Sequence, residues 1–292
     1  MLCLLCSNMA KNVDGLQQRF MDNPFSLINT ATDRWQSRKR GWIALGIESE
    51  VGRDARAFNI KEWMDETGDV QVATQSDTSI FDPALCEILY TWFVPEKTRD
   101  KDSPIDRPVV LDPFAGGSVR GIVATQLGLD YVGIELRQEQ VDANRIQMGR
   151  IKADAHATWI QGDSAKQLPK LGDKYDEAYV DIMGKALSKM QPNTFACIVV
   201  GDYRDKTGFL CNFVSKTIAA CEVHGFRLFN EIILQNVVGT LALRVARQWE
   251  TNRKIGKMHQ NVLVFYNGDP QKMKDDWHKM NLVEQKTLAE RL

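Results

Sequence analysis

Long apolar runs, histidine and net charge are all scarce in this 292-residue sequence. No stretch approaches the roughly 18 consecutive apolar residues of a membrane-spanning helix, so we expect no membrane span. The opening segment "MLCLLCSNM" lacks the basic start and the longer apolar run of a signal peptide. The net charge of −1 excludes a basic coat over the whole protein, although it allows one basic face.

The cysteines are too scattered for a zinc site. Cys3 and Cys6 form a CxxC pair, but no second pair and no histidine-rich segment follows. A structural zinc ion needs about four ligands, so we expect no metal site. The other four cysteines lie among apolar residues and are interpreted as reduced thiols, which fits a cytoplasmic protein.

Residues 1–80 are predicted to form an N-terminal appendage and linker. Trp35 and Trp42 stand seven residues apart, about two helical turns, and therefore share one helix face. We expect an amphipathic helix packed on a core. Between the tryptophans, Arg38 and Lys39 have two interpretations, either solvated side chains or contacts to nucleic-acid phosphates.

A regular alternation of strands and helices begins at residue 81. Asp82 and Pro83 indicate a helix start, an N-cap followed by proline at the first helical position. The alternation predicts an α/β domain over residues 81–268, with a mostly parallel sheet and helices on both faces. A charged helical tail is expected at 269–292. The strands are expected within residues 107–114, 130–136, 157–163, 195–205, 226–235 and 259–268.

Each of the first three predicted strands ends near an acid, Asp112, Glu135 or Asp163. Ligands bind at the carboxyl ends of such strands, so the acids are expected at one site. Gly116 and Gly117 permit close backbone approach, but the GxGxxG pattern of pyrophosphate binding is absent. A carboxylate here would repel phosphate and suit an ammonium or sulfonium group, and S-adenosylmethionine carries both. Glu135 would then accept from the ribose hydroxyls and Asp163 from the adenine amino group.

Several motifs together carry a family resemblance. "LDPFAGGSVRG" and "YVGIEL", with "NPFSLINTATDRWQSRKRGWIALGI", "FDPALCE", "VVGDYRDKTGFL" and "RKIGKMHQNVLVF", closely resemble the small, phage-type DNA amino-methyltransferases. These enzymes methylate adenine N6 or cytosine N4. The resemblance covers about residues 23–268 and implies a Rossmann-like methyltransferase fold, S-adenosylmethionine as cofactor and double-stranded DNA as partner. It places these residues at the cofactor: Phe81, Asp82, Pro83, Asp112, Pro113, Phe114, Ala115, Gly116, Gly117, Glu135 and Asp163.

One expected element is missing. The family polarises the target amino group with a (D/N/S)PP(Y/F/W) tetrapeptide after the fourth strand, and this sequence contains no Pro–Pro. Instead "LGDKYD" (171–176) leads straight into a segment of helical spacing, 177–190. The fourth strand is therefore expected to be absent and the catalytic residues are unknown. Recruitment of Asp181 or Tyr179 is disfavoured against a deletion or an incomplete sequence, because Asp181 lies inside the predicted helix.

Cations late in the chain are candidate DNA contacts. Arg204 stands at the end of the strand expected within residues 195–205, which is the fifth strand in the family's order. A solvated charged turn is the alternative interpretation. The segment 244–260 contributes Arg247, Arg253, Lys254 and Lys257, and a basic loop beside a cofactor site suits a DNA backbone. We also keep a non-catalytic protein that binds cofactor and DNA, and a methyltransferase acting on RNA or a small molecule. A nicotinamide dehydrogenase is least favoured, because its glycine pattern is absent.

Overall fold

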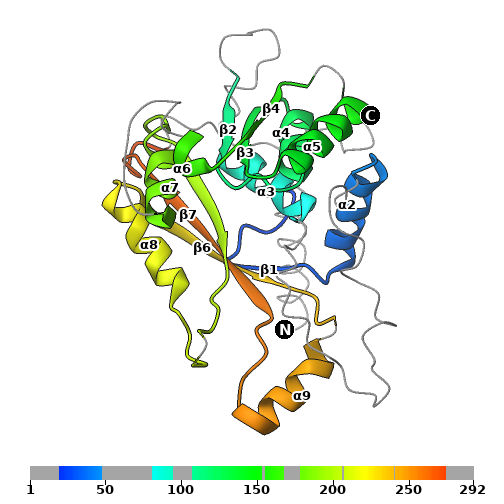
Figure 1. The fold of residues 1–292 in the computed structure, drawn as a ribbon, viewed down its shortest axis with the longest axis vertical. Coiled ribbons are helices and arrows are strands. Elements are labelled where there is room, and N and C mark those ends of the chain that lie inside the picture. The colour runs from blue at the N-terminus through cyan, green and yellow to red at the C-terminus, as the bar shows by residue number, and fades with distance from the viewer. Residues whose placement is uncertain are drawn as a thin grey trace, which may run out of the picture.

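The computed structural model describes residues 20–47, 81–94, 107–152, 155–167, 178–205, 207–239 and 241–273. Strands and helices alternate along these stretches (Figure 1). In chain order they are β1 (Leu27–Asn29), α2 (Asp33–Ala44), α3 (Pro83–Phe93), β2 (Val109–Asp112), α4 (Val119–Gln126), β3 (Asp130–Glu135), α5 (Gln138–Ile151), β4 (Ala157–Gln161), α6 (Ser164–Gln167), α7 (Ala178–Leu187), β5 (Phe195–Val200), α8 (Phe213–Val223), β6 (Arg227–Gln235), α9 (Leu241–Asn252) and β7 (His259–Tyr266).

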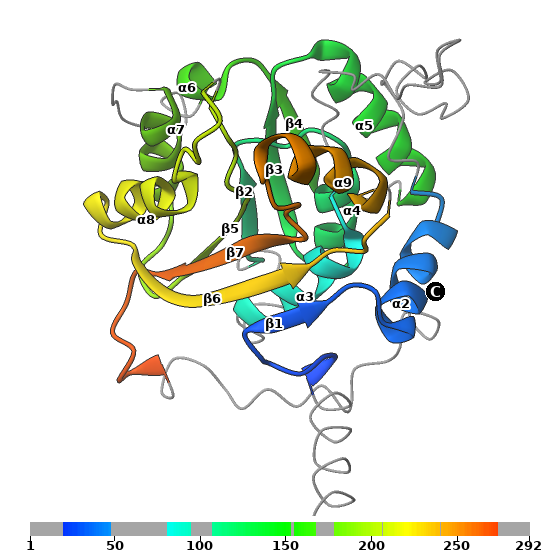
Figure 2. The ribbon, with the colours of Figure 1, turned by 90° about the horizontal axis from the view of Figure 1, so that it is seen from below.

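The strands form two sheets, and the α/β class predicted from the sequence is confirmed. One sheet has three parallel strands in the order β2-β3-β4. The other has four strands in the order β1-β6-β7-β5, in which β7 runs antiparallel to both of its neighbours (Figure 2). The expected single sheet is therefore divided, and its second part is mixed.

The division falls where the fourth strand was expected to be absent. β2 pairs only with β3, and β5 pairs only with β7, so each ends its sheet. Within the described ranges no strand lies between these two edges. Residues 168–177 between α6 and α7 are outside the described part, so the expected absence of the fourth strand stays a prediction. Asp181 lies within α7, as predicted.

Helix α3 connects the two sheets on one face. Cys86 belongs to the apolar cluster around Tyr131 of β3. Ile88, half a turn further along the helix, belongs to the cluster around Val262 and Val264 of β7. Nearly every side chain of α3 is buried, as expected of a helix that packs on several elements at once.

Helix α7 makes the equivalent connection on the opposite face. Ile182 and Ala186 pack with Ile134 of β3, and this four-residue spacing gives one helix face. Leu187 packs in a different cluster with Leu263 of β7. Since Leu263 and Val264 point to opposite faces of β7, the two helices hold the divided sheet from both sides.

The N-terminal segment is more closely integrated than the expected appendage. β1 adds to the four-stranded sheet by parallel pairing with β6. Trp35 and Trp42 of α2 are buried against α3, on the shared face predicted from their spacing. Residues 20–47 are thus packed into the α/β unit, while the predicted linker at 48–80 and the tail beyond residue 273 lie outside the described residues.

Candidate functional site

The loops that follow β2, β3 and β4 are joined by hydrogen bonds. The Ala115 amide donates to the Ile134 carbonyl at 3.0 Å. The Gly116 amide donates to Oε2 of Glu135 at 3.1 Å, and the Gly162 amide donates to the Glu135 carbonyl at 2.9 Å. Because the three strands are parallel, their carboxyl ends meet at one edge, and Glu135 is the residue that links the three loops.

Both carboxylate oxygens of Glu135 accept backbone hydrogen bonds. Oε1 accepts from the Arg137 amide at 3.0 Å and lies 3.5 Å from the Arg137 Nε, while Oε2 accepts from Gly116. A carboxylate offers about four acceptor positions, so each oxygen of Glu135 keeps capacity for another donor.

Asp163 lies in the loop after β4 and caps the short helix α6. Its Oδ1 accepts from the Ala165 amide at 3.0 Å, while Oδ2 has no partner within the described part of the chain. The neighbouring Ser164 hydroxyl donates to the Pro113 carbonyl and ties this loop to the one after β2. The structure thus brings the third predicted acid to the same strand ends.

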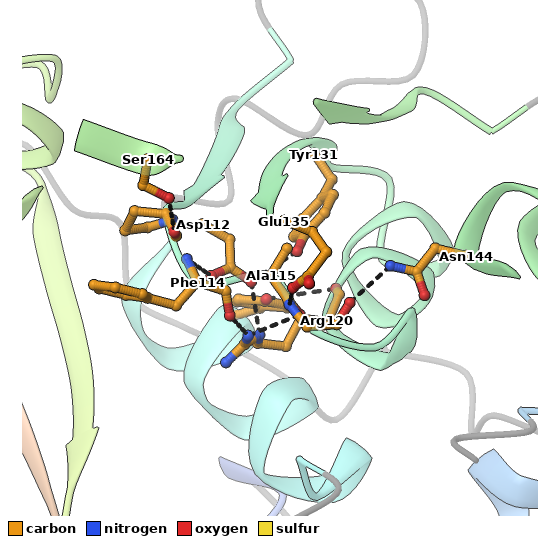
Figure 3. A network of polar contacts seen from close by, with 11 residues as sticks. Asp112, Phe114, Ala115, Arg120, Tyr131, Glu135, Asn144 and Ser164 are labelled. Atoms are coloured by element: carbon orange, nitrogen blue, oxygen red, sulfur yellow. Dashed lines mark hydrogen bonds and ion pairs between the residues drawn. The ribbon is translucent and has the colours of Figure 1, made fainter. Parts of the chain in front are cut away.

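Asp112 is held by side chains of the protein itself (Figure 3). Its Oδ2 accepts from the Tyr131 hydroxyl at 2.7 Å and lies 2.6 Å from Nε of Arg120. Its Oδ1 accepts from the Phe114 amide at 3.1 Å. Burial, together with the charge of Asp112, raises the pKa of Tyr131 well above its usual value, so this hydroxyl remains a donor. The negative charge of Asp112 is therefore compensated within the site.

Arg120, in the first turn of α4, was not among the residues predicted from the sequence. Its Nη2 donates to the carbonyl oxygens of Phe114 and Ala115, the latter at 2.9 Å. Its guanidinium carbon lies 4.8 Å from the ring centre of Phe81, which places that predicted residue beside the loop. Burial is the largest single influence and lowers the pKa of Arg120, but Asp112 together with Tyr131, Tyr90 and Cys86 outweighs it, so the pKa is raised above its usual range.

A polar stripe on α5 supports the glycine turn from below. The Asn144 amide donates to the Gly116 carbonyl at 2.8 Å, and Gln140 donates to Asn144 at 2.9 Å. One turn further along, Gln147 accepts from the Ser118 hydroxyl. These three amide side chains are buried and hydrogen-bonded, as buried polar groups must be. Their spacing on a face that should otherwise be apolar is a signal that sequence analysis could have used.

Glycines make room for this arrangement. Gly116 has a φ of +50°, in the left-handed region that favours glycine. At Gly133 an added Cβ would lie 2.7 Å from Cε1 of Tyr131 and 2.8 Å from the Ala115 Cβ. Only glycine at position 133 therefore lets the Tyr131 ring pass and reach Asp112.

Asp82 has three partners in the fold. Its Oδ1 accepts from the Ala84 amide at 2.9 Å, which confirms the predicted helix cap before Pro83. Its Oδ2 accepts from the Trp35 indole at 3.1 Å and lies 3.3 Å from Nζ of Lys39. The direct role of Asp82 in the structure is to join α2 to α3.

Arg38 is likewise paired with α3. Its Nη1 lies 3.2 Å from Oε2 of Glu87, which also accepts from the Trp42 indole at 2.6 Å. Its Nη2 donates to the Met21 carbonyl at 3.1 Å. In the structure Arg38 pairs with Glu87 of α3 and Lys39 with Asp82, the N-cap of that helix, while the phosphate contact proposed for both cations stays a prediction.

The other candidate cations come from two segments that the fold brings together. Arg204 donates to the Gly208 carbonyl at 2.9 Å, within a hairpin closed by a bridge to Leu210. A Cβ at Gly208 would lie 3.4 Å from Nζ of Lys254, so the two segments are neighbours. Arg253 lies 5.6 Å above the ring of Trp249. Lys257 is exposed, and the side chain of Arg247 lies outside the description.

Metal ligands and membrane helices are not found among the described residues. No group of three or more His, Cys, Asp and Glu side chains in that part of the chain is placed to hold a metal ion. None of its helices is long and apolar enough to cross a membrane.

No protein-family model matches the chain, and no curated protein matches it at a significant level. Among solved structures, it is similar to the precorrin-6y C5,15-methyltransferase of Geobacter metallireducens, with 13% identity, 72% of this chain and 97% of that chain covered, and a TM-score of 0.42. A TehB-like SAM-dependent methyltransferase of Corynebacterium glutamicum has 15% identity, coverage of 56% and 82%, and a TM-score of 0.34. The CcbJ methyltransferase of Streptomyces caelestis has 12% identity, coverage of 55% and 88%, and a TM-score of 0.37. Likeness this distant establishes neither a family nor an activity for this chain.

Replacing Gly133 by alanine is expected to lower the free energy of unfolding by about 1–3 kcal/mol, because the added Cβ overlaps Tyr131 and Ala115. Urea unfolding measures the change. Gly149→Ala in α5 is the matched control, since nothing lies within 4 Å of its added Cβ. That variant should be neutral or more stable by up to about 1 kcal/mol. Equal stability of the two variants would contradict the close packing at Gly133.

Proposed function

We propose that the protein binds S-adenosylmethionine at the loops after β2, β3 and β4. We further propose that it acts in the methylation of an exocyclic amino group of DNA. The observation that carries this is Glu135, whose carboxylate joins the glycine turn and keeps acceptor capacity on both oxygens. A ribose presents two adjacent hydroxyl donors, which a two-oxygen acceptor of this kind suits. The motif resemblance to DNA amino-methyltransferases supports the same assignment.

The neighbouring groups fit the rest of the nucleoside. Leu136 directly follows Glu135 and is 65% exposed, an apolar surface available to a purine ring. Asp163 offers its second oxygen to an adenine amino group. The bound cofactor would supply the activated methyl group, while these residues bind the nucleoside and fix its orientation.

Glu135→Gln is expected to weaken cofactor binding about tenfold or more, because an amide nitrogen cannot accept and a charge-assisted hydrogen bond contributes about 1.5–3 kcal/mol. Isothermal titration with S-adenosylmethionine or its demethylated product should show one site in the parent chain. The control is Glu139→Gln, an exposed acid in the first turn of α5. A parent chain without binding, or equal affinity in all three proteins, would overturn the assignment.

We also propose duplex DNA as the macromolecular partner, contacted through Arg204, Arg253, Lys254 and Lys257. The adjacency of Lys254 to Gly208 supports this, since it places cations from two segments on one surface. Asp205 in the same hairpin accepts from the Thr207 and Phe209 amides, so hydrogen bonds within the turn orient its carboxylate. Asp202 accepts from the Phe213 amide at the start of α8.

Changing Arg253, Lys254 and Lys257 together to glutamine is expected to weaken binding to every duplex alike. The salt dependence should flatten by up to about 0.9 for each lost phosphate contact. Fluorescence anisotropy over a salt series measures the slope, and competition with RNA tests the alternative substrate. A control triple variant at Lys216, Arg227 and Lys272, which are exposed elsewhere, should keep the parental slope. If both triple variants keep the parental salt dependence, Arg253, Lys254 and Lys257 are solvated surface residues and do not contact DNA.

A second candidate function is a protein that binds cofactor and DNA without catalysis. The division between β2 and β5 favours it, because the resemblance places the polarising groups after a strand that would lie there. Without them the target nitrogen keeps its lone pair delocalised and the barrier stays high.

Methyl transfer separates the two candidates. Loss of polarising contacts costs several kcal/mol, hence on the order of a thousandfold or more in rate. We therefore expect transfer of labelled methyl to duplex DNA to be slower by at least that factor than in a family member with the tetrapeptide. Transfer at the rate of such an enzyme would show that residues 177–190 contain a catalytic group.

A further inference from the structure

Arg120 is a cation at the candidate site, and it takes no part in the proposed contacts to the nucleoside. Its side chain is 22% exposed and that of Asp112 is 11% exposed, so the pair lies at the edge of the solvent. The Nε atom is paired with Asp112, and Nη2 is bound to two loop carbonyls. Within the described residues Nη1 has no hydrogen-bond or ion-pair partner.

The orientation of this guanidinium is fixed before any ligand binds. Two carbonyls hold one nitrogen, a carboxylate holds another, and the Phe81 ring covers one face of the group. A planar guanidinium restrained in this way loses little freedom when its remaining N–H groups bind a carboxylate. Lysine, a point charge on a flexible stem, could not replace this geometry.

We propose that Arg120 and Asp112 together recognise the α-amino-acid end of the cofactor, with Arg120 binding its carboxylate and Asp112 facing its ammonium group. This inference rests on the proposed cofactor. The Arg120–Asp112 pair has no net charge, so it would not favour a ligand group with a single charge. It suits a zwitterion, because the ammonium group can face Asp112 and the carboxylate can face Arg120, which leaves no uncompensated charge away from water. The proposal differs from the sequence-based expectation, in which Asp112 alone served the positive group.

Other cations near the loops are already engaged. Arg137 lies beside Glu135 and donates to Gln140 at 3.1 Å, which places it with the ribose-binding acid. Arg38 and Lys39 are bound to acids of α3. Among the described residues named here, Arg120 at the start of α4 is therefore the cation beside the loop after β2 that has an N–H group available for a carboxylate.

The test compares two ligands that differ only at the amino-acid end. S-adenosylhomocysteine carries that end, whereas 5′-methylthioadenosine keeps the nucleoside and the thioether without it. Arg120→Gln is expected to lower affinity for S-adenosylhomocysteine about 10- to 100-fold and to leave affinity for methylthioadenosine within about twofold. Arg145→Gln on α5 is the control, since Arg145 forms an exposed ion pair with Asp142 and a part-buried hydrogen bond to the Trp159 carbonyl, away from Asp112. It should leave the ratio of the two affinities unchanged.

A purely structural role gives a different result. If Arg120 only holds the loop, both ligands should lose affinity equally, and this outcome would overturn the proposal. Should Arg120→Gln fail to fold, the parent chain answers the question through decarboxylated S-adenosylmethionine, which retains the ammonium group. That ligand should bind about tenfold or more weakly than S-adenosylmethionine, and equal affinity would likewise overturn the proposal. If the parent binds none of these ligands, the proposed function fails together with this inference, whereas binding with an unchanged ratio removes only the inference.

Discussion

The connection between two separate sheets is the constraint on which the rest of this structure depends. β2 and β5 each have an edge with no neighbouring strand in the described ranges, and unpaired backbone groups are costly when they are removed from water. Helices α3 and α7 carry the connection, because each contributes side chains to the apolar clusters of both sheets. A change that loosens either helix would separate two parts of the molecule that share no ladder of hydrogen bonds.

The candidate site does not span the division between the two sheets, because its loops all belong to one sheet. Its loops follow β2, β3 and β4, and its supporting amides come from α5, which packs on the same sheet. The candidate DNA contacts lie in the other half, after β5 and before β7. The proposed cofactor site and the proposed DNA contacts therefore each depend on one sheet, while any chemistry between them would depend on how the two sheets are placed relative to each other.

The sequence was most informative where a local pattern of residues had a single physical explanation. Asp82 before Pro83, acids at the ends of apolar runs and the four-residue spacing through 182 and 186 were all predictable. β1 was missed because three residues are too few to show a strand pattern, and only its pairing with β6 defines it. The ion pair of Arg38 could not be predicted because its partner, Glu87, stands far away in the sequence.

The ion pair between Arg120 and Asp112, which could not be predicted from the sequence, changes which ligands the loop after β2 disfavours. Asp112 seemed from the sequence to repel phosphate, yet in the structure Arg120 neutralises it. Phosphate binding at a glycine turn needs free backbone amides at the start of a helix. Here the Gly116 amide already donates to Glu135, and so does the Arg137 amide. Glu135 therefore already occupies the Gly116 amide and brings a negative charge beside the glycine turn, which makes this turn less suited to a pyrophosphate.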